Sequence, residues 1–362
     1  MGLTKFIFWF EEIGKEHNDL VGKKSANLGV MTQMGMPVPL GFAISIDAYK
    51  RFIHETGVAE KIAGYVGSLS ELKGERVARF EEISRDIRSM IENQPMPQSL
   101  KTEIASYYEQ LCNRVGIPDV AVSVRSAGTA SRPGMFETYL NIRGKDEVLD
   151  KVKKVWASAF TPRAIAFRVS KGIPVDGDML GVAVPKMVNA RAAGIGFTVD
   201  PVSGDSSKIV IEANWGLGEG VVSGAETVDR FVVDKPSLEI IERAVAKKLK
   251  QVVSKETGAV WEDIPPDMQP IPCLGDDEIK EVARLARILE QRLEQPQDME
   301  WAIDPDFPFP HNVFLLQTRP AKVAVKKPES ASDQLADRLV SGFKQIDLSE
   351  AKDKMKGIEF RF

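Results

Sequence analysis

Asp298-Met-Glu-Trp301 is the segment that says most about this chain. Its residue types suit a β-strand, in which side chains alternate between two faces, so Asp298 and Glu300 share one face while Met299 and Trp301 share the other. Two carboxylates on one strand face suit a hard cation such as Mg²⁺, which proteins often bind through one or two carboxylates together with substrate phosphates. The polar outer face of an edge strand would give the same pattern.

A second strand-like segment follows at residues 313–319, Val-Phe-Leu-Leu-Gln-Thr-Arg. After its apolar run, the same alternation puts Gln317 and Arg319 on one face. If the two strands pair, the carboxylates of the first meet an amide and a guanidinium of the second. A metal site beside an arginine that can hold phosphate with two hydrogen bonds is what phosphoryl transfer requires.

An arginine earlier in the chain stands where it could meet the same ligand. Arg125 directly follows an apolar strand predicted at 120–124 and precedes a turn-rich loop that ends at Gly134. A guanidinium at a strand end can contact bound phosphate, although a surface salt bridge has the same signature. Residues that supply flexible backbone or hydroxyl groups for an anion are Gly128, Thr129, Gly134 and Thr138.

Two lysines open the helix predicted over 24–34, in the segment Val21-Gly-Lys-Lys-Ser25. The N-terminus of a helix favours anions through its free N–H groups and its dipole, which makes Lys24 a candidate phosphate ligand. The G-x-x-x-x-G-K-[ST] spacing of a P-loop is absent, so a P-loop ATPase is disfavoured. Solvated lysines are the ordinary explanation, and the segment alone does not decide between the two.

The composition is that of an ordinary globular protein. The chain has 362 residues, with 48 Lys and Arg against 52 Asp and Glu, and its length favours two or three domains. The net charge of -4 offers no basic surface for nucleic acid or for an anionic membrane. We therefore expect neither a nucleic-acid nor a membrane partner. Cys112 and Cys273 lie far apart and lack metal-ligand spacing, so we expect a reducing, cytoplasmic location.

The hydrophobic periodicity predicts an α+β protein of two lobes. The predicted helices cover 24–34, 77–90, 100–111, 146–170 and 277–293. The predicted strands cover 181–188, 194–199, 208–213 and 228–233, most of them in one antiparallel sheet, and then 298–303 and 313–317. We expect a first lobe over 1–240 with a helical insert at about 47–116, a second lobe over 241–321 that carries the metal-site strands, and a linker and tail over 322–362.

Six segments, in this order, resemble the N-terminal domain of the phosphoenolpyruvate synthase and pyruvate phosphate dikinase family: 21–31, 123–141, 156–168, 194–201, 215–224 and 298–320. The resemblance implies an ATP-grasp fold, in which two lobes with antiparallel sheets enclose Mg-ATP. It assigns Lys24, Arg125 and Arg319 to the triphosphate and to catalysis, and Asp298, Glu300 and Gln317 to Mg²⁺. It further implies nucleotide contacts from Gly134, Thr138, Met187, Glu300 and Gln317.

The sequence departs from the family pattern at two positions. Lys23 replaces a usual glycine, and Pro185 stands where synthase-like sequences carry a glutamine near the adenine. The adenine contacts therefore cannot be carried over as directly as the phosphate contacts. The loop ending Arg-Pro-Gly-Met135 looks like the dikinase form, so the assignment within the family stays open.

The three histidines, His17, His54 and His311, lie outside any motif that resembles the family's phosphohistidine loop. The chain thus looks like the small ATP-binding subunit of phenylphosphate synthase. That resemblance implies a larger partner chain that carries the phosphohistidine and the acceptor site, conversion of ATP to AMP and phosphate, and phenol as final acceptor, with the tail from Asp333 onward docking the partner. The alternatives are a nucleotide-binding domain of a pyruvate-dependent synthase or dikinase, a non-catalytic ATP-sensing subunit, and a carboxylate-activating ligase.

Overall fold

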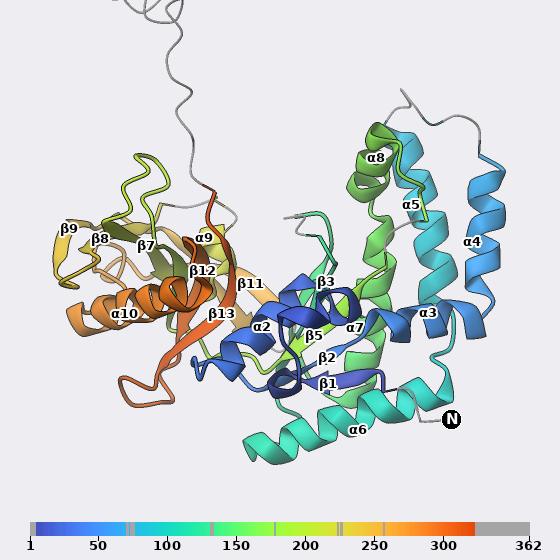
Figure 1. Cartoon of the computed structure of the whole chain (residues 1–362), viewed down its shortest axis with the longest axis horizontal. Helices are drawn as coiled ribbons and strands as arrows, with labels where there is room; N and C mark the ends of the chain where they lie inside the picture. The colour runs from blue at the N-terminus through green and yellow to red at the C-terminus, as the bar shows by residue number, and fades with distance from the viewer. Residues whose placement is uncertain are drawn as a thin grey trace, which may run out of the picture.

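Two antiparallel sheets form the framework of the molecule (Figure 1). The computed structural model describes residues 5–69, 72, 77–130, 134–176, 179–222, 224, 227–255 and 258–322. The first sheet has the strand order β1 (Ile7–Trp9), β2 (Gly41–Ile44), β5 (Gly181–Pro185), β3 (Val122–Ala127) and β4 (Thr138–Ile142). The second sheet has the order β13 (Val313–Pro320), β12 (Gln297–Ile303), β6 (Ala192–Phe197), β7 (Lys208–Trp215), β8 (Asp229–Asp234) and β9 (Ile240–Ala244).

A layer of helices covers one face of the first sheet (Figure 1). The helices that contact the strands are α3 (Ile46–Glu55), α6 (Gln98–Val115) and α7 (Lys145–Ala157). The helices packed against other helices of this layer are α4 (Val58–Gly67), α5 (Val77–Glu92) and α8 (Pro162–Lys171), and a 3-10 turn, η3 (Ser158–Phe160), joins α7 to α8. The alternation of side chains decides what each face contacts: Phe42 and Val184 enter the core under these helices, whereas Ala43 and Ala183 join the other core. The small alanine side chains let another element approach the second face closely.

That element is α2 (Lys23–Gln33), which lies between the two sheets (Figure 1). It follows η1 (Phe10–Glu12), η2 (Lys15–His17) and α1 (Asn18–Val21). Leu28 and Met31 of α2 are buried in a core shared with the second sheet. The N-terminus of α2 is thereby held at the junction of the two sheets.

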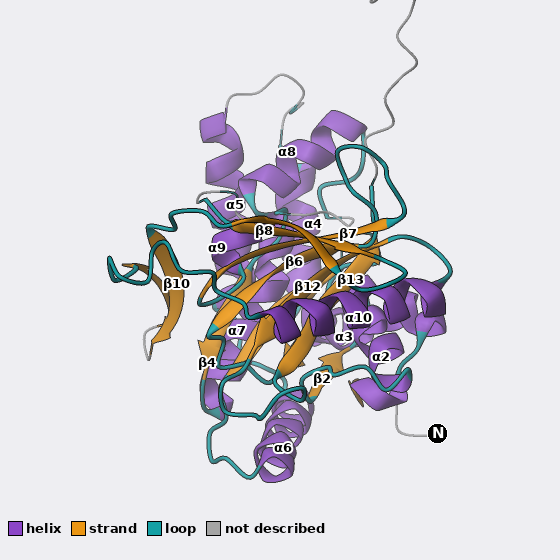
Figure 2. Cartoon of the chain, turned by 90° about the vertical axis from the view of Figure 1, so that its left-hand side faces the viewer, coloured by secondary structure: helices purple, strands orange, loops and turns teal. Residues whose placement is uncertain are grey.

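The second sheet is covered by α10 (Asp276–Leu293), which crosses the sheet in Figure 2. Met299 and Trp301 are fully buried in the core beneath it, as the alternation in the sequence predicts. The short α9 (Glu219–Val222) contacts β7, as does the hairpin of β10 (Lys250–Lys255) and β11 (Gly258–Asp263) through β10. The hairpin also reaches the edge strand β4 of the first sheet. In the described part of the chain, no helix is both long and apolar enough to cross a membrane.

The structure corrects several sequence-based boundaries. The helix predicted over 146–170 is two helices, because Pro162 begins α8 and the Thr161 side chain caps it by accepting a hydrogen bond from Ala164 N at 3.2 Å. The strand predicted to end at Val124 continues to Ala127, so Arg125 lies within β3. Strands β9, β10 and β11 were not predicted, because they are largely exposed and lack an apolar pattern.

The predicted lobe boundary near residue 240 does not coincide with the division between the sheets. β5 belongs to the first sheet and β6 to the second, so the sheets divide between residues 185 and 192, and residue 240 is the first of β9. Strand propensity predicts where strands lie but not which strands pair, which explains the difference. The predicted docking tail from Asp333 lies outside the described residues.

A buried ion pair lies at the start of β8 in the second sheet. Asp229 and Lys248 are both fully buried, and the Lys248 ammonium lies 2.6 Å from Asp229 Oδ1. The Asp229 carboxylate also accepts hydrogen bonds from the backbone N–H groups of Ala246 and Cys273, and Lys248 donates to the Ala246 carbonyl. Each charge is therefore both paired and hydrogen-bonded, the condition under which burial of charge is tolerated.

We expect Lys248→Met to lower the free energy of unfolding by about 3–5 kcal/mol, because Asp229 is left as a buried charge without its counterion. Urea denaturation measures the change. The control is Lys280→Met, which removes an exposed pair with Glu239 and costs less than about 1 kcal/mol. Equal effects of the two substitutions would contradict this account.

Candidate functional site

The N-terminus of α2 abuts the end of β3, and a glycine makes this contact possible. Gly22 has φ 79° and ψ 156°, a conformation that is essentially restricted to glycine. A Cβ at this position would lie 1.9 Å from the carbonyl oxygen of Ala127, and the next residue, Lys23, donates its backbone N–H to the Gly128 carbonyl at 2.8 Å. The packing directs the first turn of α2, with Lys24, towards the residues of β3.

The two C-terminal strands pair, which the sequence alone left open. In the antiparallel pair of β12 and β13, Asp298 stands opposite Arg319 and Glu300 opposite Gln317. Arg319 Nε donates to Asp298 Oδ2 at 2.7 Å, and Gln317 Nε2 donates to Glu300 Oε1 at 3.1 Å. A bulge between Glu300 and Trp301 interrupts the register beside this cluster.

Arg125 connects the first sheet to this cluster on the second sheet. Its guanidinium donates to Glu300 Oε2 at 3.1 Å, to Gln317 Oε1 at 3.3 Å and to the Leu316 carbonyl at 3.2 Å. Its Nε is buried and has no hydrogen-bond partner in the described structure. The guanidinium therefore contacts the carboxylate and amide that the sequence places in the metal site and still has a donor to spare.

Lys24 completes a group of three cations. Among the described residues its ammonium has neither a hydrogen-bond nor an ion-pair partner. Burial, aided by the neighbouring positive charges of Arg125 and Arg319 and opposed by Glu300, lowers the pKa of Lys24 to about 8. A partly buried lysine without a partner among the described residues, close to two arginines, is an environment that favours an anionic ligand.

The donor set fits Mg²⁺ held jointly with a ligand. The described residues contain no cluster of three or more His, Cys, Asp or Glu side chains that could enclose a metal ion alone. Asp298, Glu300 and Gln317 nevertheless supply carboxylate and amide oxygens side by side. Mg²⁺ is usually bound by one or two carboxylates together with substrate phosphates, so an incomplete cage of hard oxygen ligands suits this ion.

The other predicted nucleotide ligands come from β4, the loop before it and the linker between the sheets. Thr138 is exposed and stands opposite Arg125 in the pairing of β3 with β4, so both side chains share a face. Gly134 is exposed, with φ 65°, and its carbonyl accepts a hydrogen bond from Arg163 at 3.0 Å. Met187 lies on the linker, where its backbone N–H donates to Ala121 O. The nucleotide roles of Gly134, Thr138 and Met187 remain predictions.

Two residues at the junction of the sheets were not found from the sequence. Asn27 of α2 donates to the Thr318 carbonyl at 2.7 Å and so fixes α2 against β13. Asp304, fully buried after β12, accepts the backbone N–H of Asn189 at 3.3 Å and that of Asp306 at 3.1 Å, which ties the linker to the second sheet. The sequence does not reveal these contacts, because the partners of Asn27 and Asp304 are backbone groups that lie far away in sequence or on a loop.

Comparison with known proteins identifies the family. The family described as "Pyruvate phosphate dikinase, AMP/ATP-binding domain" matches residues 18–338. The chain belongs to this family. With its two antiparallel sheets, this membership confirms the α+β ATP-grasp class expected from the sequence.

Relatives of the chain include proteins named phosphoenolpyruvate synthase. The probable phosphoenolpyruvate synthase of Staphylothermus marinus is 39% identical over 384 residues, which cover 98% of this chain and 45% of that protein. The phosphoenolpyruvate synthase of Aeropyrum pernix is 40% identical over 363 residues, covering 90% and 43%. The chain thus spans less than half the length of these relatives.

A solved structure, the ADP complex of the purK N5-carboxyaminoimidazole ribonucleotide synthetase, aligns with 69% of this chain and 59% of its own chain. The sequence identity is 8% and the TM-score is 0.26, so this likeness is too weak to add an argument.

Gly22→Ala is expected to move α2 and to weaken ATP binding, because the added Cβ would meet the Ala127 carbonyl and displace Lys24. Gly35→Ala is the matched control: Gly35 also has a positive φ, 71°, but a Cβ added there would meet no atom within 4 Å. Both substitutions cost about 1 kcal/mol or more of stability through backbone strain. Isothermal titration with ATP separates them, and equal affinities would refute the role assigned to this contact.

The pKa of Lys24 predicts how ATP binding depends on pH. A bound triphosphate favours the charged ammonium and raises its pKa, so binding at a pH just above 8 takes up a proton, and affinity falls as the pH rises through about 8. Calorimetry in two buffers of different ionisation enthalpy measures the uptake. We expect Lys24→Met to abolish it and the neighbouring Lys23→Met to retain it; uptake that persists in Lys24→Met would assign the proton to another group.

Proposed function

We propose that this chain binds ATP together with Mg²⁺ between its two sheets and transfers a phosphoryl group to a histidine on a larger partner chain. The observation that carries the proposal is the convergence of Lys24, Arg125 and the paired strands β12 and β13. Three cations meet two carboxylates there, and one of the cations has no partner among the described residues. Family membership supports the nucleotide, since the family is described as an AMP/ATP-binding domain.

Each residue of the cluster has a proposed task. Lys24, Arg125 and Arg319 bind the triphosphate and stabilise the negative charge that is redistributed during transfer, which is the main electrostatic contribution to phosphoryl transfer. Asp298, Glu300 and Gln317 would hold Mg²⁺, which when bound neutralises phosphate charge and aligns the reacting groups. The remaining nucleotide contacts are assigned to the loop backbone at Gly134, the hydroxyl of Thr138 and Met187 on the linker.

The proposed overall reaction balances as follows: ATP, water and a histidine give AMP, inorganic phosphate and phosphohistidine. One phosphoryl group replaces the proton on the imidazole nitrogen, and water supplies the oxygen of the released phosphate. The nucleophile is assigned to a partner because His17, His54 and His311 make none of the hydrogen bonds of the cluster.

Two final acceptors compete in the proposal. Phenol is the acceptor if the chain is the small subunit of a phenylphosphate synthase, the assignment its sequence suggests. The names of the relatives favour the alternative, a pyruvate-dependent synthase. No residue of the cluster discriminates between the two, since the acceptor would react with the phosphohistidine and not with ATP.

The test is transfer of label from ATP carrying ³²P in the β-phosphate. We expect the purified chain, added with Mg²⁺ to a native extract that contains its partner, to place acid-labile label on a larger polypeptide. Glu300→Gln should slow this labelling by about two orders of magnitude, the size of effect seen when one electrostatic contact to a transition state is lost. The reaction of the isolated labelled polypeptide with pyruvate or phenol then identifies the acceptor.

Glu290→Gln provides a matched control. Glu290 and Glu300 have similar exposed side-chain fractions, 20% and 22%, and each forms one ion pair, but Glu290 pairs with Lys235 on the far side of the second sheet. This variant should label the partner at the wild-type rate. Tight ATP binding by the wild-type chain without label on any polypeptide would replace the catalytic proposal by a non-catalytic ATP-sensing role.

A further inference from the structure

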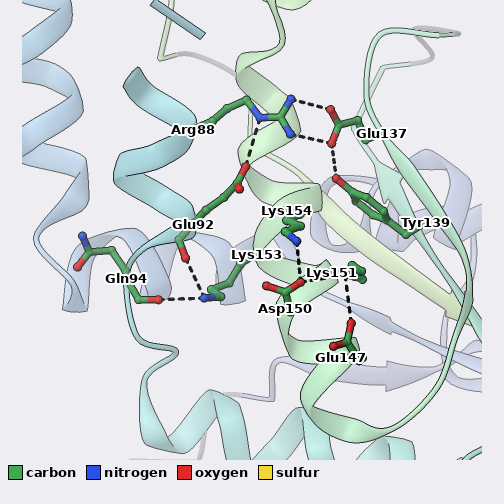
Figure 3. A network of polar contacts seen from close by, with 10 residues as sticks. All are labelled: Arg88, Glu92, Gln94, Glu137, Tyr139, Glu147, Asp150, Lys151, Lys153 and Lys154. Carbon is green, nitrogen blue, oxygen red and sulfur yellow. Dashed lines mark hydrogen bonds and ion pairs between the residues drawn. The ribbon is translucent and has the colours of Figure 1, made fainter. Parts of the chain in front are cut away.

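Arg88 of α5 holds the residue that precedes β4. Its guanidinium donates two hydrogen bonds to Glu137, Nη1 to Oε1 at 2.6 Å and Nη2 to Oε2 at 2.9 Å (Figure 3). The Tyr139 hydroxyl also donates to Glu137. These contacts join the helical layer to the beginning of an edge strand across 49 residues of sequence.

The helix that carries Arg88 is itself fixed. Lys153 of α7 donates to the carbonyl groups of Glu92 and Gln94 at the end of α5, at 2.9 and 3.3 Å (Figure 3). Glu92 additionally accepts a hydrogen bond from Arg88 Nε at 3.3 Å. Arg88 is thus a fixed point on a packed layer, and its two hydrogen bonds define both the position and the direction of the Glu137 carboxylate.

Because side chains alternate along β4, the Arg88 and Glu137 pair also affects where Thr138 lies. Tyr139 stands opposite Val124, a fully buried residue of the core under the helices, whereas Thr138 stands opposite Arg125 on the face that meets the second sheet. Neighbouring residues of a strand point to opposite faces. Glu137 and Tyr139 are therefore tied to the helical layer, and Thr138 between them is exposed beside Arg125.

The segment just before Glu137 is held on the same side by other contacts. Thr161 Oγ1 donates to the Met135 carbonyl at 2.9 Å, and Arg163 donates to the Gly134 carbonyl at 3.0 Å. Both contacts act on backbone carbonyl groups, whereas the Glu137 carboxylate itself is held by Arg88 and Tyr139. The charge of Arg88 is secure in this place, because the hydrogen bonds to Glu137 raise its pKa in spite of burial.

We propose that Arg88 is a positioning residue for the phosphate site: by fixing Glu137 on the helical layer, it holds the Thr138 hydroxyl and backbone beside Arg125. This inference rests on the proposed function, in which Thr138 contacts nucleotide phosphate. It gives the helical insert a part in ligand binding although Arg88 itself touches no ligand. The ligand class affected is any nucleotide that carries a polyphosphate, since adenosine has no phosphate for the cations to bind.

The experiment compares ATP with adenosine on the whole chain. We expect Arg88→Met to weaken ATP binding about tenfold and adenosine binding less than twofold, because a displaced contact group affects only the phosphates. Arg88→Lys keeps the charge but not the two-pronged geometry and should give an intermediate affinity. Hydrogen exchange of residues 134–142 without ligand should accelerate in Arg88→Met.

Lys235→Met separates positioning from general stability. The Lys235 and Glu290 side chains are somewhat more buried than Arg88 and Glu137 and form a 2.8 Å ion pair. Lys235 follows β8 and Glu290 lies on α10, away from the cluster. This control should lower the melting temperature without changing the ratio of ATP to adenosine affinity. If Arg88→Met lowers the melting temperature and leaves that ratio unchanged, the inference is wrong and the pair is only structural. If the wild-type chain binds no ATP at all, the proposed function fails and this inference fails with it.

Discussion

The contact of Arg125 with Glu300 is the interaction on which the arrangement of the site depends, because it joins the two sheets at the place where their polar residues meet. The same guanidinium contacts Gln317 and the Leu316 carbonyl, so one side chain from β3 is bound to both β12 and β13. Such close approach requires small residues beneath it. Ala43, Ala183 and Gly22 provide the room in which α2 lies between the sheets, and larger side chains there would separate Arg125 from its acceptors.

The charges at this junction are nearly balanced without a ligand, and the one unpaired positive charge favours the binding of an anion. Arg319 is paired with Asp298, and Arg125 with Glu300, so four of the five charges balance. Lys24 is the fifth charge, and its lowered pKa reflects the energy required to keep an ammonium in a partly desolvated place beside two arginines. An anion removes this penalty, and a magnesium polyphosphate offers both a cation for the carboxylates and acceptors for the arginines.

The sequence was sufficient where local pattern determines structure and insufficient where distant segments meet. Asp298, Glu300, Gln317 and Arg319 could be placed on matching strand faces because a strand alternates with a period of two, and the two strands are close in sequence. The break at Pro162 was missed because the apolar spacing continues through it. The pairing of β6 with β12, and of Arg88 with Glu137, joins segments far apart in sequence, and no local signal encodes such a pairing. Position in the sequence made Lys24 and Arg125 candidate ligands, and the family resemblance assigned them to the triphosphate, whereas the contacts that position them came only from the structure.

The sheets are also joined away from Arg125, which limits how they can move when a ligand enters. Asn141 at the end of β4 donates to the Lys255 carbonyl of the β10–β11 hairpin, and Asp304 holds the linker that carries Met187. Because these two contacts join the sheets, the sheets can separate only slightly unless the contacts break. Arg125 can exchange one hydrogen-bond acceptor for another without any such separation. Phosphate oxygens accept the same two-pronged hydrogen bonds as a carboxylate, so the guanidinium can pass from Glu300 to a phosphate while its charge stays paired. In the proposed function, the released carboxylate would then be available to a cation, and Arg125 would couple the binding of phosphate to the binding of metal.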